Sequence, residues 1–476
     1  MTEQKNTQLV VIGAGPGGYA AAFLAADLGL QVTLVDPEEN PGGVCLYRGC
    51  IPSKSLLHVA HLLHEARRAE AYGIDFAPPT IDLDRLRGWK EKVVDQLTGG
   101  LGQLCARRKI EHIRGLARFK GADTVTISTP DEQVLELRFE KAIIASGSRP
   151  VAVPGLGEPS ARVLDSTGAL QLDILPESLL VIGGGYIGLE LGSVYAALGS
   201  DVSVVEMLPG LLTGADKDLV RVLKKRLDEQ FAEIWTDTRV VSVEDADDGV
   251  VVVLENKAGE TSEYRFDRVL VSVGRQPNTE SLGLENTRVK IDEQGFIKTD
   301  ARQQTAEPTI FAIGDVAGQP VLAHKASHEG RVAVEVIAGH KVAFDPAAIP
   351  AVVYTDPEIA WCGLTESEAK SRKITHKTVR FPWAASGRAL SQNSGDGMTK
   401  LIVDPDSERI LGIGLVGTGA GELIAEGVLA IEMAALASDL KLTIHPHPTL
   451  SETIMEAAEV FFGQATHVYR PLKKRP

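Results

Sequence analysis

Two stretches of the chain share one pattern of apolar and polar positions. Residues 9–36 read LVVIGAGPGGYAAAFLAADLGLQVTLVD, and residues 179–206 read LLVIGGGYIGLELGSVYAALGSDVSVVE. Each opens with an apolar β-branched run, passes through glycines into an Ala- and Leu-rich stretch, and closes with a second apolar run that ends in a carboxylate. This order predicts a strand, a helix and a parallel strand, so the chain repeats one βαβ unit.

The glycines of both units stand at the spacing of a dinucleotide-binding turn. The first glycine permits the tight turn, the second lets the backbone approach a pyrophosphate, and the third lets helix and strand pack closely. The helix that follows offers N–H donors and a positive dipole end to phosphate. The predicted binding glycines are Gly13, Gly15 and Gly18 in the first unit, and Gly183, Gly185 and Gly188 in the second.

An acidic residue ends each unit, where it can accept hydrogen bonds from ribose hydroxyls. These residues are Asp36 and Glu206. Glu206 is followed by MLPGLL, without an arginine to hold a 2′-phosphate, so the second site is predicted to prefer NAD over NADP. Two nucleotide sites in one chain suggest an electron path between two dinucleotides, the first of them a flavin.

The rest of the chain predicts further elements. Residues 54–106 are predicted to be helical, residues 110–147 to be rich in strands, and residues 240–253 and 269–273 to be strands. From about residue 349 the pattern changes to mixed strands and Ala-rich helices without a glycine fingerprint. That change predicts a separate domain.

Composition narrows the class of protein. The 476 residues carry 49 basic and 64 acidic side chains, a net charge of −15, which disfavours nucleic acid and anionic membrane surfaces as partners. No apolar run is long enough to span a membrane, and the polar N-terminus does not resemble a signal peptide. Four cysteines are too few for a disulfide scaffold, so the predicted compartment is the cytoplasm.

Residues 45–54, CLYRGCIPSK, carry the candidate chemistry. Cys45 and Cys50 are close enough to form a small redox disulfide, which we favour over a zinc site or an inert buried pair. Pro52 and Ser53 suit the first turn of a helix, which places Cys50 near a helix N-terminus where thiolate is favoured. Lys54 adds positive charge one turn on. Cys105 and Cys362 are expected to be buried apolar residues.

A second candidate is the segment 443–452, TIHPHPTLSE. A histidine with a nearby carboxylate is the minimum for a general base and its orienting group, and thiol–disulfide exchange needs such a base. The residues alone do not choose between His445 and His447.

These motifs together resemble the pyridine nucleotide–disulfide oxidoreductase family, class I, and within it the dihydrolipoamide dehydrogenases that act as E3 components of 2-oxoacid dehydrogenase complexes. The similarity runs from Val10 to about Phe462. It is carried by residues 43–54, SGSRP at 146–150, the glycine turn at 183–190, VGR at 273–275, IGDV at 313–316, residues 381–389 and HPT at 447–449.

The resemblance implies an enzyme that uses FAD and NAD to oxidise protein-bound dihydrolipoyl groups while NAD⁺ is reduced. It implies that Cys45 exchanges with the substrate and that Cys50 faces the flavin, near Lys54 and its partner Glu190. It selects His447 as the base, oriented by Glu452 and reaching the site of a partner subunit, so it implies a homodimer. A lipoyl-bearing carrier protein is the implied partner, with no nucleic acid, membrane or metal.

The resemblance also implies the cofactor contacts and the domains. The FAD contacts are Gly13, Gly15, Gly18, Asp36, Gly43, Val44, Lys54, Ala117, Ser146, Gly147, Asp315 and Ala323. The NAD contacts are Gly183, Gly185, Tyr186, Gly188, Glu206, Val240, Gly274 and Arg275. The expected fold is α/β, with two Rossmann-like domains and an α+β dimerisation domain: FAD-binding at 1–150, NAD-binding at 151–276, a central segment returning to the FAD domain at 277–348, and the interface domain at 349–476.

One departure stands between the cysteines, where the family commonly has Asn-Val and this chain has Tyr47-Arg48. It is either neutral loop variation or a sign of a shifted potential or another lipoyl carrier, as in glycine cleavage or sulfur oxidation. Two competing hypotheses for the whole chain are a disulfide reductase of the glutathione-reductase type and an inactive structural subunit. The basic tail at 470–476 is expected to be a solvated end or a carrier-docking segment.

Overall fold

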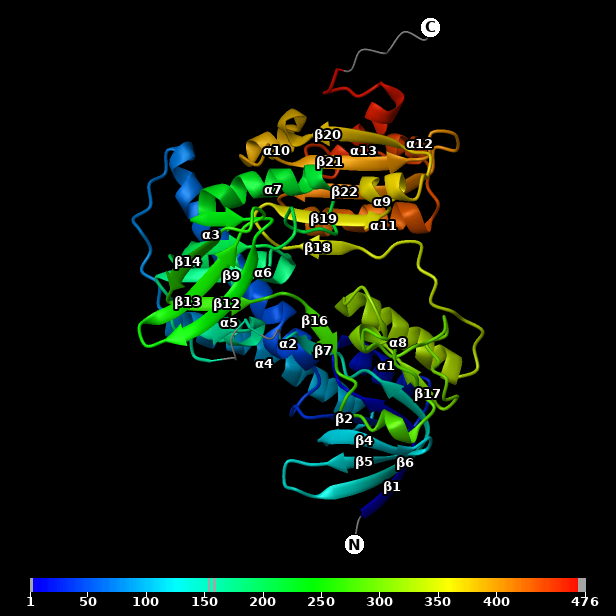
Figure 1. Cartoon of the computed structure of the whole chain (residues 1–476). Helices are drawn as coiled ribbons and strands as arrows, with labels where there is room; N and C mark the ends of the chain where they lie inside the picture. Colours follow the sequence, from blue (N-terminus) through cyan, green and yellow to red (C-terminus); the bar gives the residue numbers. More distant parts are fainter. Residues whose placement is uncertain (1–2, 153–154, 157–159, 470–476) are drawn as a thin grey trace.

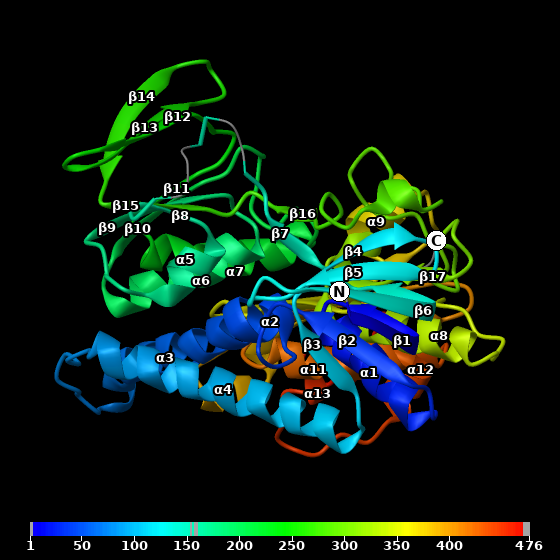
Figure 2. The same cartoon turned by 90° about the horizontal axis from the view of Figure 1, so that it is seen from below.

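The computed structural model describes residues 3–152, 155–156 and 160–469, and the basic tail at 470–476 lies outside them. The first βαβ unit forms as predicted, with β1 (Glu3–Ile12), α1 (Pro16–Asp27) and β2 (Val32–Asp36), and the two strands pair in parallel. Its sheet has the order β3-β2-β1-β6-β5-β4 (Figures 1 and 2). The added strands are β3 (Glu111–Arg114), β4 (Leu116–Gly121), β5 (Thr124–Ser128) and β6 (Val134–Ile144).

A distant segment completes this first sheet. Strand β17 (Ile310–Ala312) pairs in parallel with β6, and α8 (Ala323–Ile337) packs beside α1. Between them lies the short turn η3 (Gly314–Ala317), which carries Asp315. Residues far along the chain therefore stand next to the first glycine turn.

The second βαβ unit also forms as predicted, with β9 (Ser178–Ile182), α6 (Tyr186–Leu198) and β10 (Asp201–Val205). Its sheet has the order β11-β10-β9-β15-β8, with β11 (Glu233–Trp235), β15 (Arg268–Val271) and β8 (Val163–Leu164). Helices α5 (Ser166–Gln171) and α7 (Lys217–Gln230) belong to the same region. Strand β15 confirms most of the strand expected at 269–273.

Residues 240–253, read as strand, are divided by a turn. They lie in β12 (Arg239–Ala246) and β13 (Gly249–Glu255), which pair antiparallel and are joined by β14 (Thr261–Phe266) in a three-stranded sheet. The chain turns at Asp247 and Asp248, just before Gly249 with a φ of +143°. An Asp-Gly pair between apolar runs is a hairpin signal, so the sequence contained the information for this turn.

Sterics explain the first and third glycines of each fingerprint. A Cβ on Gly13, whose φ is +98°, would lie 2.3 Å from the Ala145 carbonyl oxygen, and one on Gly18 would lie 1.8 Å from the oxygen of Gly13. Gly183 and Gly188 repeat this arrangement, with clashes at 2.6 Å and 2.3 Å. Any side chain at these positions would push the strand and helix apart.

The predicted helical region at 54–106 contains two long helices. The short helix α2 (Gly43–Arg48) leads into α3 (Cys50–Arg68) and the 3₁₀ turn η1 (Ala69–Tyr72), and α4 (Leu83–Arg107) follows after a loop.

A small two-stranded sheet connects the regions of the two βαβ units. In it, strand β7 (Ser148–Pro150) pairs antiparallel with β16 (Arg275–Pro277) (Figure 1).

The C-terminal region is an antiparallel sheet covered by helices, which confirms the expected α/β class with an α+β C-terminal part. The sheet order is β18-β19-β22-β21-β20. No helix in the described part of the chain is long and apolar enough to cross a membrane. The strands are β18 (Ala351–Val353), β19 (Glu358–Gly363), β20 (Lys377–Pro382), β21 (Met398–Val403) and β22 (Ile410–Gly417), and the main helices are α9 (Glu366–Ser371), α11 (Ala420–Glu432), α12 (Ala437–Leu442) and α13 (Glu452–Phe462).

A buried ion cluster joins this sheet to α7. The ammonium group of Lys400, only 1% exposed, lies 2.8 Å from carboxylate oxygens of Asp216 and Glu366 and 3.0 Å from Asp218. Asp216 stands at the N-cap of α7, and Arg380 also pairs with Asp218 at 2.5 Å. One buried cation therefore holds three carboxylates from two parts of the chain.

We expect Lys400→Met to destabilise the protein by about 3–5 kcal/mol, because three carboxylates would lose their shared cation in a buried place. The measurement is the midpoint of chemical unfolding at fixed protein concentration. Lys224→Met is the matched control, since it removes an exposed pair with Asp228 worth about 0.5 kcal/mol. Equal midpoints for the two variants would contradict this prediction.

Candidate active site

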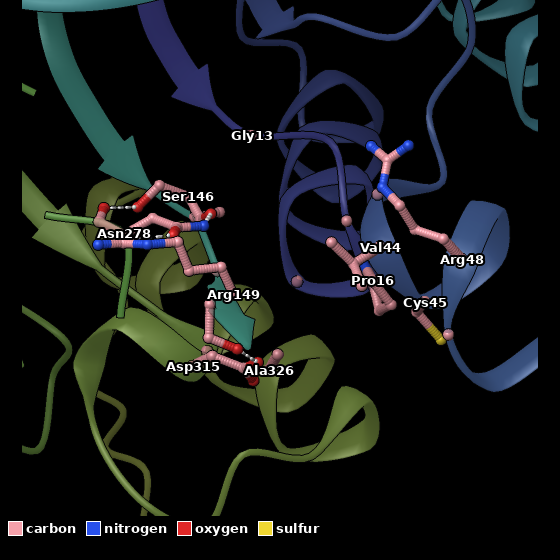
Figure 3. Close-up of a pocket in the computed structure, with 18 of the residues that line it drawn as sticks. Gly13, Pro16, Val44, Cys45, Arg48, Ser146, Arg149, Asn278, Asp315 and Ala326 are labelled. Atoms are coloured by element: carbon pink, nitrogen blue, oxygen red, sulfur yellow. Dashed lines mark hydrogen bonds between the residues drawn. The ribbon is translucent and has the colours of Figure 1, made fainter. Parts of the chain in front are cut away.

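A cavity of about 840 Å³ brings together residues from distant parts of the chain (Figure 3). Both candidate cysteines line it, together with Lys54 and Glu190. The expected FAD contacts that also line it are Gly13, Gly15, Asp36, Gly43, Val44, Ala117, Ser146, Gly147, Asp315 and Ala323. Gly18 lies behind this wall, in the contact between strand and helix.

The residues expected to contact NAD divide into two groups. Tyr186 and Arg275 line the cavity just described. The others, Gly183, Gly185, Gly188, Glu206, Val240 and Gly274, are not part of its lining. The second glycine turn therefore lies outside this cavity. Tyr186, the first residue of α6, follows that turn and also lines the cavity.

The two acidic residues at the ends of the units are held in the same way. Asp36 accepts hydrogen bonds from the backbone N–H groups of Ala14 (2.6 Å) and Glu38 (3.0 Å). Glu206 accepts from the N–H groups of Gly184 (2.7 Å) and Leu208 (2.8 Å). Each carboxylate is thereby fixed beside its glycine turn, with further lone pairs left for another donor.

Helix α3 positions the two thiols. Cys50 is its first residue, and Cys45 lies in the short helix α2 before it. Both are free thiols; Cys45 is half-buried and Cys50 is exposed where it lines the cavity. The neighbouring Cys45 thiol lowers the pKa of Cys50 most and the charge of Lys54 lowers it further, so that it falls to about 7 although the protein atoms packed around the sulfur oppose this. The same pairing raises the pKa of Cys45 far above its ordinary value.

Glu190 is the centre of a buried polar group beneath the thiols. It is 2% exposed and accepts from Lys54 Nζ (2.7 Å), Ser53 Oγ (3.1 Å) and the Tyr354 N–H (3.0 Å). Burial alone would lower the pKa of Lys54, but the adjacent carboxylate raises it above its ordinary value. Lys54 therefore remains a cation beside Cys50 and stabilises its thiolate.

Asp315 is bound to the strand pair that connects the two units. It accepts a hydrogen bond from Ser148 Oγ (2.5 Å), and Arg275 donates to the hydroxyl (2.8 Å) and carbonyl (2.6 Å) oxygens of Ser148. Arg275, expected to contact NAD, is thus held in the wall of the first cavity.

Sequence reasoning missed Ser148 and Asn278, which also line this wall. Asn278 exchanges hydrogen bonds with Ser146 at 2.8 and 2.9 Å (Figure 3). The segments SGSRP at 146–150 and VGR at 273–275 were visible as motifs, but only the pairing of β7 with β16 shows that they lie side by side.

The structure distinguishes the two candidate histidines. The side chain of His445 is 5% exposed, and its ring nitrogens contact the Thr443 carbonyl (2.9 Å) and Glu426 (2.8 Å). His447 is 75% exposed, and its Nδ1 lies 2.9 Å from Glu452, which also accepts from the Thr449 N–H (2.7 Å). Among the described residues Nε2 of His447 has no partner, so His447 is the histidine free to exchange a proton. Neither His447 nor Glu452 lines the cavity of its own subunit.

The chain belongs to the pyridine nucleotide–disulphide oxidoreductase family, whose model matches residues 7–330, while residues 349–458 match the dimerisation domain of that family. It is an oxidoreductase, and the dimerisation domain supports a homodimer. The family uses FAD and NAD(H), in agreement with the cofactors expected from the two fingerprints.

Within this family the chain is similar to dihydrolipoyl dehydrogenases. It is 48% identical to the dihydrolipoyl dehydrogenase of Vibrio cholerae, covering 98% of both chains, and 49% identical to that of Haemophilus influenzae, covering 98% of this chain and 97% of the relative. Among solved structures, LpdA from Mycobacterium tuberculosis matches with a TM-score of 0.88 at 27% identity, over 95% of this chain and 99% of the other. The resemblance seen in the motifs is confirmed.

Proposed function

We propose that this chain oxidises protein-bound dihydrolipoyl groups to lipoyl groups, with FAD as bound cofactor and NAD⁺ as electron acceptor. The observation that carries the proposal is the thiol pair at the wall of the large cavity, with one pKa near 7 and the other far higher. The similarity to dihydrolipoyl dehydrogenases over nearly the full chain supports the same substrate class.

The residues of the first cavity fit FAD. Gly15 is the N-cap residue of α1 and has no side chain to cap the helix, so the first N–H groups of α1 can bind a pyrophosphate. A Cβ on Gly15 would have only one neighbour within 4 Å, the Gly43 Cα at 3.9 Å, so the space before this helix end is open. Asp36 would take the ribose, and Lys54 would lie beside the flavin.

The second unit fits NAD for the same reasons. Helix α6 also begins at an uncapped glycine, Gly185, with no atom within 4 Å of a hypothetical Cβ. The carboxylate of Glu206, fixed by two backbone N–H groups, can accept hydrogen bonds from ribose hydroxyls and repels a 2′-phosphate, which favours NAD over NADP. We accordingly assign residues 1–150 and 277–348 to the FAD-binding part, 151–276 to the NAD-binding part and 349–476 to the interface domain.

The chemistry is an exchange between two dithiol–disulfide pairs. One dihydrolipoyl thiolate attacks Cys45 of the Cys45–Cys50 disulfide and Cys50 leaves as thiolate; the second substrate sulfur then displaces Cys45 and closes the lipoyl disulfide. The enzyme now holds two electrons and the dithiol form seen in the structure. FAD held in the cavity beside Cys50 and Lys54 would supply the two-electron carrier between this dithiol and NAD⁺. The net result is lipoyl, NADH and one proton.

The base in this exchange is the exposed His447 of the second copy. Glu452 fixes its Nδ1, which leaves Nε2 to take the proton of the substrate thiol. Exposed apolar side chains nearby support a subunit interface at this face, namely Leu429, Met433, Leu442 and Ile444. The lipoyl carrier, whether of a 2-oxoacid complex, glycine cleavage or sulfur oxidation, and the cytoplasmic location stay predictions.

The test is anaerobic turnover of the yellow holoenzyme with dihydrolipoamide and NAD⁺, followed by NADH absorbance. We expect rapid NADH formation with NAD⁺, little with NADP⁺, and no oxidation of NADPH by glutathione disulfide. Flavin that is reduced by NADH without any turnover of dihydrolipoamide would show that another disulfide is the substrate.

A further inference from the structure

The loop at 37–42 begins in the wall of the large cavity. It leaves β2 at Asp36 and returns at Gly42, whose N–H donates to the Ala14 carbonyl at 2.8 Å. Pro37 and Glu38 both line the cavity next to Asp36. The start of the loop therefore lines the cavity at the end where we propose that the adenosine ribose of FAD binds, and the loop continues into the helix that carries Cys45.

Tyr47 holds the middle of this loop. Its hydroxyl donates to the Asn40 carbonyl at 3.0 Å and accepts from the Asn40 N–H at 3.3 Å. On the other side, a Cβ on Gly102 of α4 would lie 2.1 Å from the Asn40 side-chain oxygen. Asn40 is thus enclosed between α2 and α4, with its side-chain oxygen close to the Gly102 backbone.

Arg48 holds the beginning of the same loop. Its guanidinium forms an ion pair with Glu38, and both side chains are less than half exposed and line the cavity. Figure 3 shows the guanidinium directed away from the sulfur of Cys45. The charge of Arg48 is therefore engaged at the nucleotide end of the cavity.

We propose that Tyr47 and Arg48 clamp loop 37–42 over the adenosine end of FAD and thereby set how slowly FAD leaves the enzyme. This inference rests on the proposed binding of FAD in this cavity. It gives the charge of Arg48 a role at the nucleotide end of the cavity, because the guanidinium pairs there with Glu38. Release of the nucleotide requires the loop to move, and the clamp must open first.

The experiment measures FAD release from the holoenzyme. The protein is diluted into buffer without FAD, and protein-bound flavin is determined by absorbance after rapid gel filtration at successive times. We expect release to be about tenfold faster in Arg48→Ala, corresponding to about 1.4 kcal/mol, and about threefold faster in Tyr47→Phe, which removes only the hydroxyl. Arg107→Ala, an exposed position on α4, is the matched control and should release FAD at the rate of the natural protein.

Two further measurements show whether the ion pair itself slows release. The exchanged pair Glu38→Arg with Arg48→Glu should restore slow release to within about threefold, because it reverses the ion pair without removing it. The pH midpoint for alkylation of Cys50 should stay unchanged in Arg48→Ala. Unchanged FAD release in Arg48→Ala, with or without a shifted alkylation midpoint, would overturn the proposal, as would a failure of the exchanged pair to slow release. A natural protein that purifies without flavin would instead refute the proposed function.

Discussion

Replacement of Cys50 by serine is expected to lower turnover of dihydrolipoamide with NAD⁺ by more than about 10³-fold. A hydroxyl cannot form the disulfide with Cys45, so the enzyme loses the only pair in the cavity that can accept two electrons from the substrate. The variant should still bind FAD, because Cys50 is exposed at the cavity wall and serine is of nearly the same size. Turnover and bound flavin are measured on the same preparation.

The pH dependence of alkylation adds a second readout. Because the pKa of Cys50 is lowered to about 7, its thiolate fraction increases as the pH rises through 7, and the rate of alkylation should follow with a midpoint there. Cys105→Ser is the control, since burial raises the pKa of that thiol to about 11 and it lies outside the cavity lining. Substantial turnover in Cys50→Ser would rule out the proposed exchange.

His447→Gln is expected to lower turnover by about 10²–10³-fold, because the amide retains a polar contact with Glu452 but cannot accept a proton near pH 7. His445→Gln is the matched control: both ring nitrogens of His445 are already bound, so its replacement should leave turnover nearly unchanged. Turnover of the two variants is compared under the same conditions, and equal turnover in His447→Gln and His445→Gln would contradict the assignment of the base.

Mixed dimers test whether His447 acts in the opposite subunit. When Cys50→Ser and His447→Gln chains are combined, one of the two sites in each mixed dimer contains both an intact thiol pair and an intact histidine. Each variant alone is nearly inactive, so activity in the mixture would come from that site. If the mixture stays as inactive as its parents, His447 does not serve the partner.

The local parts of the fold were predictable because their signals are local. The two glycine turns, their helices and their acidic ends follow from positive φ angles, close packing of helix on turn and hydrogen bonds within about thirty residues, and both units form where the sequence predicts. The start of α3 at Cys50 follows from Gly49 and Pro52 for the same reason. The signal for the hairpin within residues 240–253 is also local, but the strand prediction took the apolar run as continuous and overlooked the Asp248-Gly249 turn.

The remaining parts depend on contacts between distant residues. No spacing in the chain shows that Ser148 joins Arg275 to Asp315, since these residues meet only after β7 and β16 have paired. The difference between His445 and His447 likewise depends on Glu426, whose position relative to the histidines is set by the packing of α11. Sequence reasoning could identify the reactive residue types but not the partners that fix their protonation.

The pairing of β17 with β6 has a consequence for biosynthesis. Ile144 and its partner Ala312 lie far apart in the sequence, and the whole second βαβ unit is encoded between them. A ribosome must therefore translate the second unit before the nascent chain can complete the first sheet, a delay on the order of ten seconds or more at ordinary elongation rates. During that interval residues 142–144 of β6 lack the strand that pairs with them beyond the β5 contact at 134–138, and the segment that carries Asp315 is not yet made. The complete FAD site therefore forms late in synthesis. The first βαβ unit, which begins with β1, acquires its last strand only after the second βαβ unit has been translated.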